Sequence, residues 1–130
     1  MSEFVRQGRG KRLDENEARE LFGQLVSAVG YLHEMGICHR DLKLTNILIN
    51  DEGNLKLIDF GFSTIANRLF KTYCGTPSYM CPELVKKMDY DGIAVDMWAM
   101  GVILYKMVTG DYPFGSEKDQ FLNQRILTCD

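Results

Sequence analysis

The chain has 130 residues, of which 45% are hydrophobic and 25% are charged, a composition ordinary for one soluble globular domain. Its net charge of -3 gives no general reason to expect nucleic acid or an anionic membrane as a partner. Its four cysteines form no Cys-x-x-Cys pair and no histidine lies at metal-ligand spacing, so neither a zinc site nor a disulfide framework is indicated. The expected location is intracellular, in the cytoplasm first and the nucleus second.

The beginning of the chain shows no targeting signal. Met1 is followed by charged residues where a signal peptide would need an apolar run. The longest uncharged apolar run, 97–105, is too short to span a bilayer, so no membrane partner is expected. A cluster of basic residues precedes the first predicted helix: Arg6, Arg9, Lys11 and Arg12. We interpret this cluster as a solvated connection rather than as a binding patch.

Residues 14–35 show the pattern of a long amphipathic helix. Asp14 with Glu17 three residues later forms a capping box, and Gly36 marks the end. Apolar residues recur along one face: Ala18, Leu21, Phe22, Leu25, Val29 and Leu32. His33 lies in the last turn, where a favourable contact with the helix dipole is a better interpretation than a catalytic role.

The stretch 39–46 places a carboxylate, two cations and an amide within eight residues, which indicates a catalytic loop. Two short apolar runs, 47–49 and 55–58, flank a cluster of turn residues and predict a β-hairpin. The ends of this hairpin hold Asn46 and Asp59. A rigid hairpin can therefore bring two oxygen ligands from separate sequence positions towards one cation.

Residues 59–83 lack helical or strand periodicity over a length unusual for a passive loop, which favours a functional loop. Residues 94–109 are apolar on nearly every side, which predicts a helix that is buried all round and ends at Gly110. Asp96 within this helix needs hydrogen-bond donors around it, because an unpaired buried carboxylate is costly. One more short helix is expected at 116–127.

Four motifs follow one another along the chain: His39-Arg40-Asp41-Leu42-Lys43-Leu44-Thr45-Asn46, Asp59-Phe60-Gly61, Cys81-Pro82-Glu83 and Asp96-Met97-Trp98. In this order and spacing the chain resembles the eukaryotic serine/threonine protein kinases from about Phe4 to about Leu127. The resemblance implies an α+β fold, the large C-terminal lobe of a kinase domain, mainly α-helical with a short β-hairpin beside the catalytic loop. Residues 1–130 would then be a partial kinase domain with an activation segment at 59–83.

The resemblance implies transfer of the γ-phosphoryl group of ATP, with Mg²⁺, to Ser or Thr of a protein substrate. Asp41 is implied to accept the proton of the substrate hydroxyl, and Lys43 to face the γ-phosphate. Asn46 and Asp59 are implied to hold the magnesium ion, and Leu48 to contact the nucleotide beside Lys43, Asn46 and Asp59. The alternative, that Asp41 and Asp59 are ordinary loop carboxylates, is disfavoured by the two matched motifs together.

Further residues take implied roles from the same resemblance. Thr72 lies eleven residues before Glu83, where such kinases carry a phosphorylation site for an upstream activating kinase, and Arg40 is the implied partner of that phosphate. Asp96 is implied to hold the backbone of the catalytic loop. The implied structural residues are His39, Phe60, Gly61, Glu83 and Asp96. The implied substrate pocket consists of Tyr73, Thr76, Pro77 and Met80.

Lys43, two residues after Asp41, and Gly75-Thr76-Pro77 resemble serine/threonine kinases rather than tyrosine kinases. The context around 60–63 and 72–77 is most similar to the calmodulin-dependent and AMP-activated-like kinases. Cys81 replaces the alanine usual in the family, with little consequence expected.

The 130 residues contain no Gly-rich loop, no strand lysine for the α/β phosphates and no helix glutamate to pair with it. The small N-terminal lobe and the last helices of the large lobe are therefore expected to be missing. Two classes of function stay open, a kinase domain and a truncated kinase-like binding or regulatory module. Retention of the catalytic-loop and metal residues favours the kinase. By itself the chain is expected to transfer phosphate poorly or not at all, unless a partner chain supplies the absent lobe.

Overall fold

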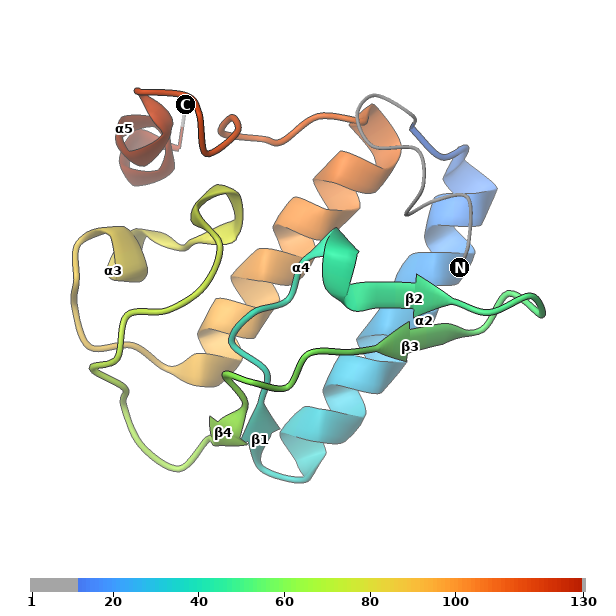
Figure 1. Ribbon diagram of the computed structural model, residues 1–130, viewed down its shortest axis with the longest axis horizontal. Coiled ribbons are helices and arrows are strands. Elements are labelled where there is room, and N and C mark those ends of the chain that lie inside the picture. The colour runs from blue at the N-terminus through green and yellow to red at the C-terminus, as the bar shows by residue number, and fades with distance from the viewer. Residues whose placement is uncertain (1–11, 130) are drawn as a thin grey trace.

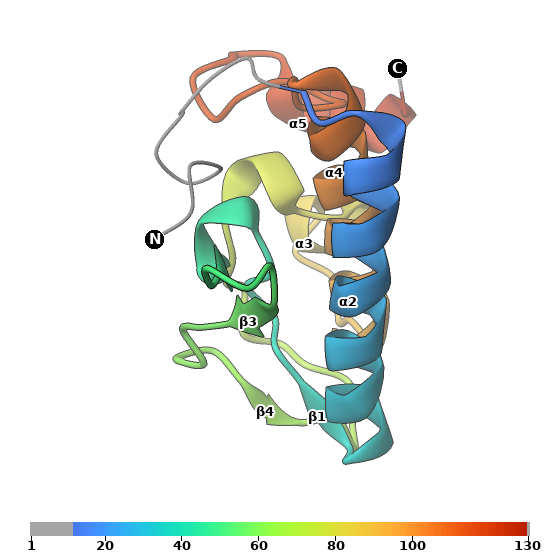
Figure 2. The ribbon, with the colours of Figure 1, turned by 90° about the vertical axis from the view of Figure 1, so that its right-hand side faces the viewer.

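A computed structural model describes residues 12–129, and two long helices form its centre. Helix α2 (Glu15–Glu34) and helix α4 (Gly92–Thr109) lie side by side and run in opposite directions (Figure 1). The hairpin and the short strands lie on one side of α2, as the turned view shows (Figure 2). The other elements are β1 (Ile37–Cys38), η1 (Leu44–Asn46), β2 (Ile47–Ile49), β3 (Leu55–Leu57), β4 (Thr64–Ile65), η2 (Pro77–Tyr79), α3 (Pro82–Val85) and α5 (Leu122–Thr128).

Helix α2 begins and ends where its sequence predicts. The Asp14 carboxylate accepts the backbone N–H of Asn16 and of Glu17, and the Glu17 side chain accepts the N–H of Asp14, which completes the capping box. Gly36 follows the helix with φ +73°, a left-handed conformation that glycine adopts without strain. The capping box and the helix end are therefore confirmed. Its buried face includes Ala18, Leu25 and Val29.

Helix α4 was predicted at 94–109 and spans Gly92–Thr109, with its end at Gly110 confirmed. The prediction that it is buried all round is wrong. Met97 is 56% exposed and Tyr105 45% exposed, because the described residues pack on one face of the helix only. Helix α4 is long and apolar enough to cross a membrane. The buried core helix of a soluble protein can have the same length and composition. Its packing against α2 is that of a core helix.

The short elements confirm the hairpin and correct two other predictions. Strands β2 and β3 pair antiparallel with Leu48 opposite Lys56. Residues 59–83 contain regular structure, because β4 pairs with β1, the strand just before the catalytic loop, and η2 and the start of α3 also fall within this range. The last helix, α5, is shorter than the predicted 116–127. Of the basic cluster that was interpreted as a solvated connection, Arg6, Arg9 and Lys11 lie outside the described residues.

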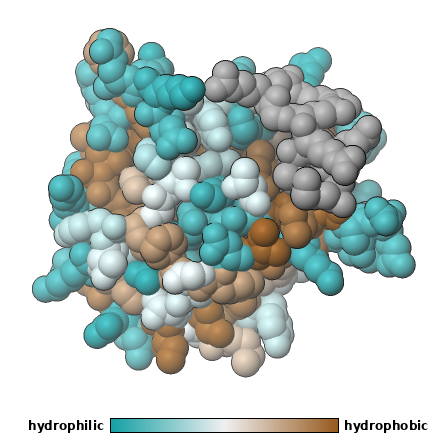
Figure 3. All heavy atoms as spheres, viewed as in Figure 1, coloured by the Kyte–Doolittle hydropathy of each residue, from teal (hydrophilic) through white to brown (hydrophobic). Residues whose placement is uncertain are grey.

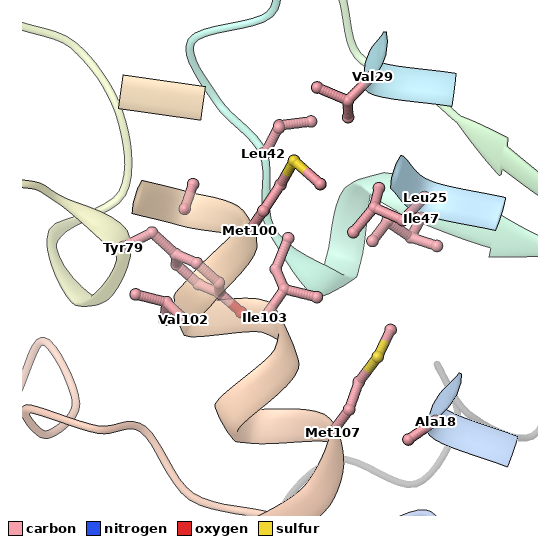
Figure 4. Packing of buried hydrophobic residues seen from close by; sticks show 11 residues of the cluster. Ala18, Leu25, Val29, Leu42, Ile47, Tyr79, Met100, Val102, Ile103 and Met107 are labelled. Atoms are coloured by element: carbon pink, nitrogen blue, oxygen red, sulfur yellow. The ribbon is translucent and has the colours of Figure 1, made fainter. Parts of the chain in front are cut away.

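Two groups of buried side chains hold the molecule together. The larger one lies between α2 and α4 and takes in Leu42 and Ile47, which are both 1% exposed and come from either side of the loop turn at η1 (Figure 4). The smaller one gathers around the start of α4 from these residues: Cys38, Phe70, Cys81, Leu84, Tyr90 and Val95. The catalytic loop therefore starts and ends in packed core, which gives it a rigid base.

The surface around the catalytic loop, residues 39–46, has both apolar and polar side chains. Apolar patches lie between polar ones, and several lie along the lower edge in the region of β1 and β4 (Figure 3). Large apolar side chains that remain exposed near these strands are Ile58, Phe60, Phe62 and Ile65.

Candidate active site

Asp96 connects the catalytic loop to α4 through hydrogen bonds. Its side chain is fully buried, and one carboxylate oxygen accepts the backbone N–H of His39 at 2.8 Å while the other accepts that of Arg40 at 2.8 Å. His33 Nε2 donates to the same carboxylate at 2.9 Å. Asp96 thus has the donors that its burial requires. His33, for which only a dipole contact was expected, joins α2 to this anchor through a side-chain contact that the sequence analysis missed.

His39 connects the catalytic loop to the end of β3. The N–H of Asp41 donates to its Nδ1 at 3.1 Å, so Nδ1 is the acceptor and Nε2 carries the proton. That Nε2–H donates to the carbonyl of Ile58 at 3.1 Å. The ring meets Phe60 edge to face at 5.0 Å between centroids. His39 therefore joins the loop 39–46 to the residues that follow β3.

Two residues of the site have left-handed backbones without being glycine. Arg40 has φ +65° and Asp59 has φ +60°. Such conformations cost free energy and persist only when surrounding contacts hold them. For Arg40 those contacts are the Asp96 carboxylate and two bonds from its own guanidinium, described below.

Asp41, Lys43 and Thr76 form one hydrogen-bonded group. Asp41 is 7% exposed, and its Oδ1 accepts the Thr76 hydroxyl at 3.2 Å. Lys43 Nζ lies 3.8 Å from Asp41 Oδ2 and donates to Thr76 Oγ1 at 2.9 Å. The threonine hydroxyl therefore fixes the relative positions of a carboxylate and an ammonium group. Thr76 was expected in the substrate pocket, and the structure has it in contact with the two catalytic candidates.

Asn46 and Asp59 offer the oxygen atoms suited to a hard cation. Asn46 Nδ2 donates to the carbonyl of Asp41 at 2.9 Å, which leaves its Oδ1 as a ligand. The N–H of Ile58 donates to the carbonyl of Asn46 at 2.9 Å, which holds residues 46 and 58 together. The Asp59 carboxylate is exposed, with one long contact from the N–H of Gly61 at 3.4 Å. An amide oxygen, a free carboxylate and added phosphate and water oxygens fit Mg²⁺.

A site built only from protein carboxylates, imidazoles and thiols does not occur in residues 12–129, where no group of three or more such side chains could hold a metal. Magnesium sites that use one or two protein ligands plus phosphate oxygens do not need such a group. Leu48, implied as a nucleotide contact, is half-buried in β2 beside this pair.

The Arg40 guanidinium is directed towards the activation segment. Its Nε donates to the carbonyl of Phe62 at 2.7 Å, and its Nη1 donates to the hydroxyl of Tyr90 at 3.1 Å. The group also lies over the ring of Phe70 at 4.7 Å. Thr72 is exposed, and its carbonyl accepts the Tyr90 hydroxyl. Arg40 and Thr72 are therefore linked through Tyr90, a residue that the sequence analysis did not single out.

The other candidate residues lie further along the same segment. Tyr73 is partly exposed and donates its hydroxyl to the carbonyl of Lys87. Pro77 starts η2 and Met80 follows it, both half-buried. Glu83 is exposed and forms no ion pair within residues 12–129.

Burial shifts the pKa of several groups in the described part of the chain. It raises the pKa of the Cys81 thiol to about 11, raises the pKa of Cys38 and Tyr79, and lowers the pKa of the Lys106 ammonium. Burial also raises the pKa of Tyr90, against the lowering effect of Arg40. These thiols and phenols are accordingly neutral near pH 7.

Comparison with known proteins identifies the family. Residues 1–129 match the protein kinase domain. The chain is 47% identical over 119 residues to the serine/threonine-protein kinase kin-29 of Caenorhabditis elegans, covering 90% of this chain and 14% of that protein. It is 49% identical over 126 residues to CBL-interacting protein kinase 24 of Oryza sativa subsp. japonica, covering 95% of this chain and 27% of that protein.

The relatives are much longer proteins, since the chain spans between 14% and 29% of their length. The matched range, residues 1–129, includes the loop 39–46, the segment 59–83 and Asp96 on α4. With a match over residues 1–129, the chain belongs to the protein kinase domain family.

Proposed function

We propose that these residues are the catalytic part of a serine/threonine protein kinase, which transfers the γ-phosphoryl group of ATP to a protein hydroxyl. The observation that carries the proposal is the group formed by Asp41, Lys43 and Thr76, with the Asn46 side chain bonded to the carbonyl of Asp41. Catalysis of phosphoryl transfer consists mostly of positioning and charge stabilisation, and this group supplies both.

Each residue has a distinct task in this proposal. The Asp41 carboxylate accepts the hydrogen bond of the substrate hydroxyl and orients its oxygen. Thr76 occupies one oxygen of that carboxylate, which fixes its rotamer. Lys43 places a positive charge beside the transferring group. Bound Mg²⁺, held by Asn46 and Asp59, would neutralise phosphate charge.

The test needs a nucleotide that is enclosed on both sides, so we would join the chain to the N-terminal lobe of a serine/threonine protein kinase. Magnesium-dependent transfer of phosphate from ATP to a protein substrate is measured with and without the Asp41→Asn substitution. We expect transfer that falls by at least about 100-fold in the variant, the lower range for loss of a general base. The matched control is Asp111→Asn, an exposed carboxylate outside the site.

A binding or regulatory module without catalysis is the second candidate, favoured by the exposed apolar side chains at Phe60, Phe62 and Ile65, which suit a docking surface. It predicts that the joined protein binds partners and that Asp41→Asn changes nothing. Equal, background-level transfer by the parent and the variant would decide for this second candidate.

Substrate choice follows from two positions where relatives that favour basic sequences often carry glutamate. Here they are Thr45, which is exposed, and Lys106, whose Nζ lies 3.8 Å from the centroid of the Tyr112 ring. Neither provides a carboxylate for an arginine two residues before the acceptor. We expect weak selection for basic residues upstream and apolar selection just downstream, at Tyr73, Pro77 and Met80. A peptide array on the joined protein measures this preference, and a profile dominated by arginine at the second upstream position contradicts it.

We further propose that the protein acts inside the cell, on protein substrates and downstream of an activating kinase, with no nucleic acid or membrane as partner. The four cysteines are free thiols, which suits a reducing compartment.

A further inference from the structure

The activation segment lies along the chain that leads into α4. The backbone of Phe70 pairs with that of Tyr90 in both directions, at 2.8 and 3.1 Å. Two further contacts flank this bridge. The Lys71 ammonium pairs with the Asp89 carboxylate, and the Tyr73 hydroxyl donates to the backbone carbonyl of Lys87. The segment around Thr72 is therefore docked in the unmodified chain.

The hydroxyl of Tyr90 lies at the centre of this docking. Tyr90 is 3% exposed, and its ring packs on Phe70 at 5.7 Å between centroids. The hydroxyl accepts Arg40 Nη1 at 3.1 Å and donates to the carbonyl of Thr72, with Cys74 Sγ at 3.8 Å. A phenol hydroxyl can donate one hydrogen bond, and here it donates to the carbonyl of Thr72. Its oxygen accepts the hydrogen bond from Arg40.

We propose that Tyr90 is a positioning residue that docks the activation segment onto Arg40 while Thr72 is unmodified, and that a phosphate on Thr72 takes over this task. The inference rests on the proposed function, in which Arg40 is the partner of that phosphate. It adds that a second, phosphate-independent link already joins the same two residues. The high pKa that burial gives the phenol keeps its proton available for the Thr72 bond.

The geometry explains why one link can replace the other. Thr72 is exposed, so its hydroxyl is accessible to a modifying enzyme. The Nη2 group of Arg40 has no hydrogen-bond partner in the described part of the chain and can donate to a phosphate oxygen. A phosphate adds close to two negative charges and several acceptors at this point. The bond from the Tyr90 hydroxyl to the carbonyl of Thr72 joins two neutral groups and is weaker than a charged arginine–phosphate pair.

The test uses the 130-residue chain and its Tyr90→Phe variant, which keeps the ring and loses only the hydroxyl. Amide hydrogen exchange of Phe70 and Tyr90 is followed by NMR, in the unmodified chain and in chain made with phosphothreonine at position 72. In the unmodified chain we expect the variant to exchange these amides about 5 to 30 times faster, the range for loss of a buried hydrogen bond. In the phosphorylated chain we expect less than a twofold difference.

The matched control is Tyr105→Phe, which removes a hydroxyl from an exposed ring on α4 and should leave these amides unchanged. A merely structural effect of Tyr90→Phe would speed exchange throughout α4, including Ile103 at the core, and would overturn the proposal. So would equal acceleration in the phosphorylated and unmodified chains, or none in either. No readout here requires phosphate transfer, so an inactive kinase would defeat the proposed function and leave this result standing.

Discussion

At the residue scale, the buried Cys81 thiol should contribute to the loss of folding stability at alkaline pH. Burial raises the pKa of its thiol to about 11 from an ordinary value of 9.0. The folded chain therefore holds the proton more tightly than the unfolded chain does. This contribution to the free energy of unfolding is fully present below pH 9 and is lost as the pH rises towards 11, by up to about 2 kcal/mol.

Urea unfolding in reductant at pH 7, 9 and 10.5 measures this loss. We expect Cys81→Ala to reduce the fall in unfolding free energy between pH 9 and 10.5. A remaining fall is expected from Cys38 and Tyr79, whose pKa values are raised in the same direction. Exposed Cys129→Ala is the control and should keep the parent profile. Parallel curves for parent and Cys81→Ala would show that this thiol does not contribute.

Thr72 is the residue at which we expect activity to be switched. In the joined protein, Thr72→Ala should prevent the gain in activity that an activating kinase confers. We expect at least about a tenfold difference, since one or more charge-assisted bonds to Arg40 are lost. Thr128→Ala, an exposed threonine on α5, is the control. Full activation of the Thr72→Ala protein would rule out this role.

At the element scale, two glycines of α4 should respond to alanine in opposite ways. A Cβ at Gly92 would lie 2.4 Å from the sulfur of Cys38 and 3.1 Å from the ring of Phe70, so Gly92→Ala forces the start of α4 away from β1 and from Phe70. We expect a loss of about 1 to 3 kcal/mol of unfolding free energy. Gly101 is exposed with nothing near its Cβ position, and Gly101→Ala should add about 0.5 to 1 kcal/mol.

Urea unfolding of the two variants beside the parent measures both effects. Both variants make the same substitution in the same helix, but only at Gly92 would the added Cβ meet other atoms. Equal stability changes in both variants would mean that the close approach of α4 to Cys38 is not maintained in solution.

At the scale of the whole molecule, we expect the 130 residues by themselves to transfer phosphate poorly or not at all. They contain no Gly-rich loop and no strand lysine to hold the phosphates. A groove between α2 and β3 is open to solvent, with Tyr31, Leu57 and Phe60 along it. Well-positioned reactants supply about 7 to 11 kcal/mol of barrier reduction, and a nucleotide held on one side forfeits much of this.

The measurement is magnesium-dependent transfer from ATP to a protein substrate by the chain alone, with Asp41→Asn as the control. Turnover within the usual kinase range of about 1 to 100 per second that disappears in the control would contradict this expectation. The same assay on the joined protein provides the positive reference.

Much of the fold and of the chemistry could be predicted from the sequence because its signals are short-range. The capping box at Asp14, the glycine after α2 and the hairpin turn act between residues a few positions apart, and the structure has all three. The loop 39–46 concentrates its functional groups within eight residues, so their chemistry was visible before their geometry was known. These interactions depend on local backbone preferences, which the residues themselves determine.

Only the tertiary structure decided which distant side chains meet. His33 reaches Asp96 across 63 positions, Thr76 reaches Asp41 across 35, and the Tyr90 hydroxyl reaches Thr72 across 18. No periodicity encodes such contacts, because they depend on how α2 and α4 pack and on where the activation segment docks. The same reason explains the exposed face of α4: its sequence determined that the helix is apolar, and the packing of its neighbours decided which side is buried.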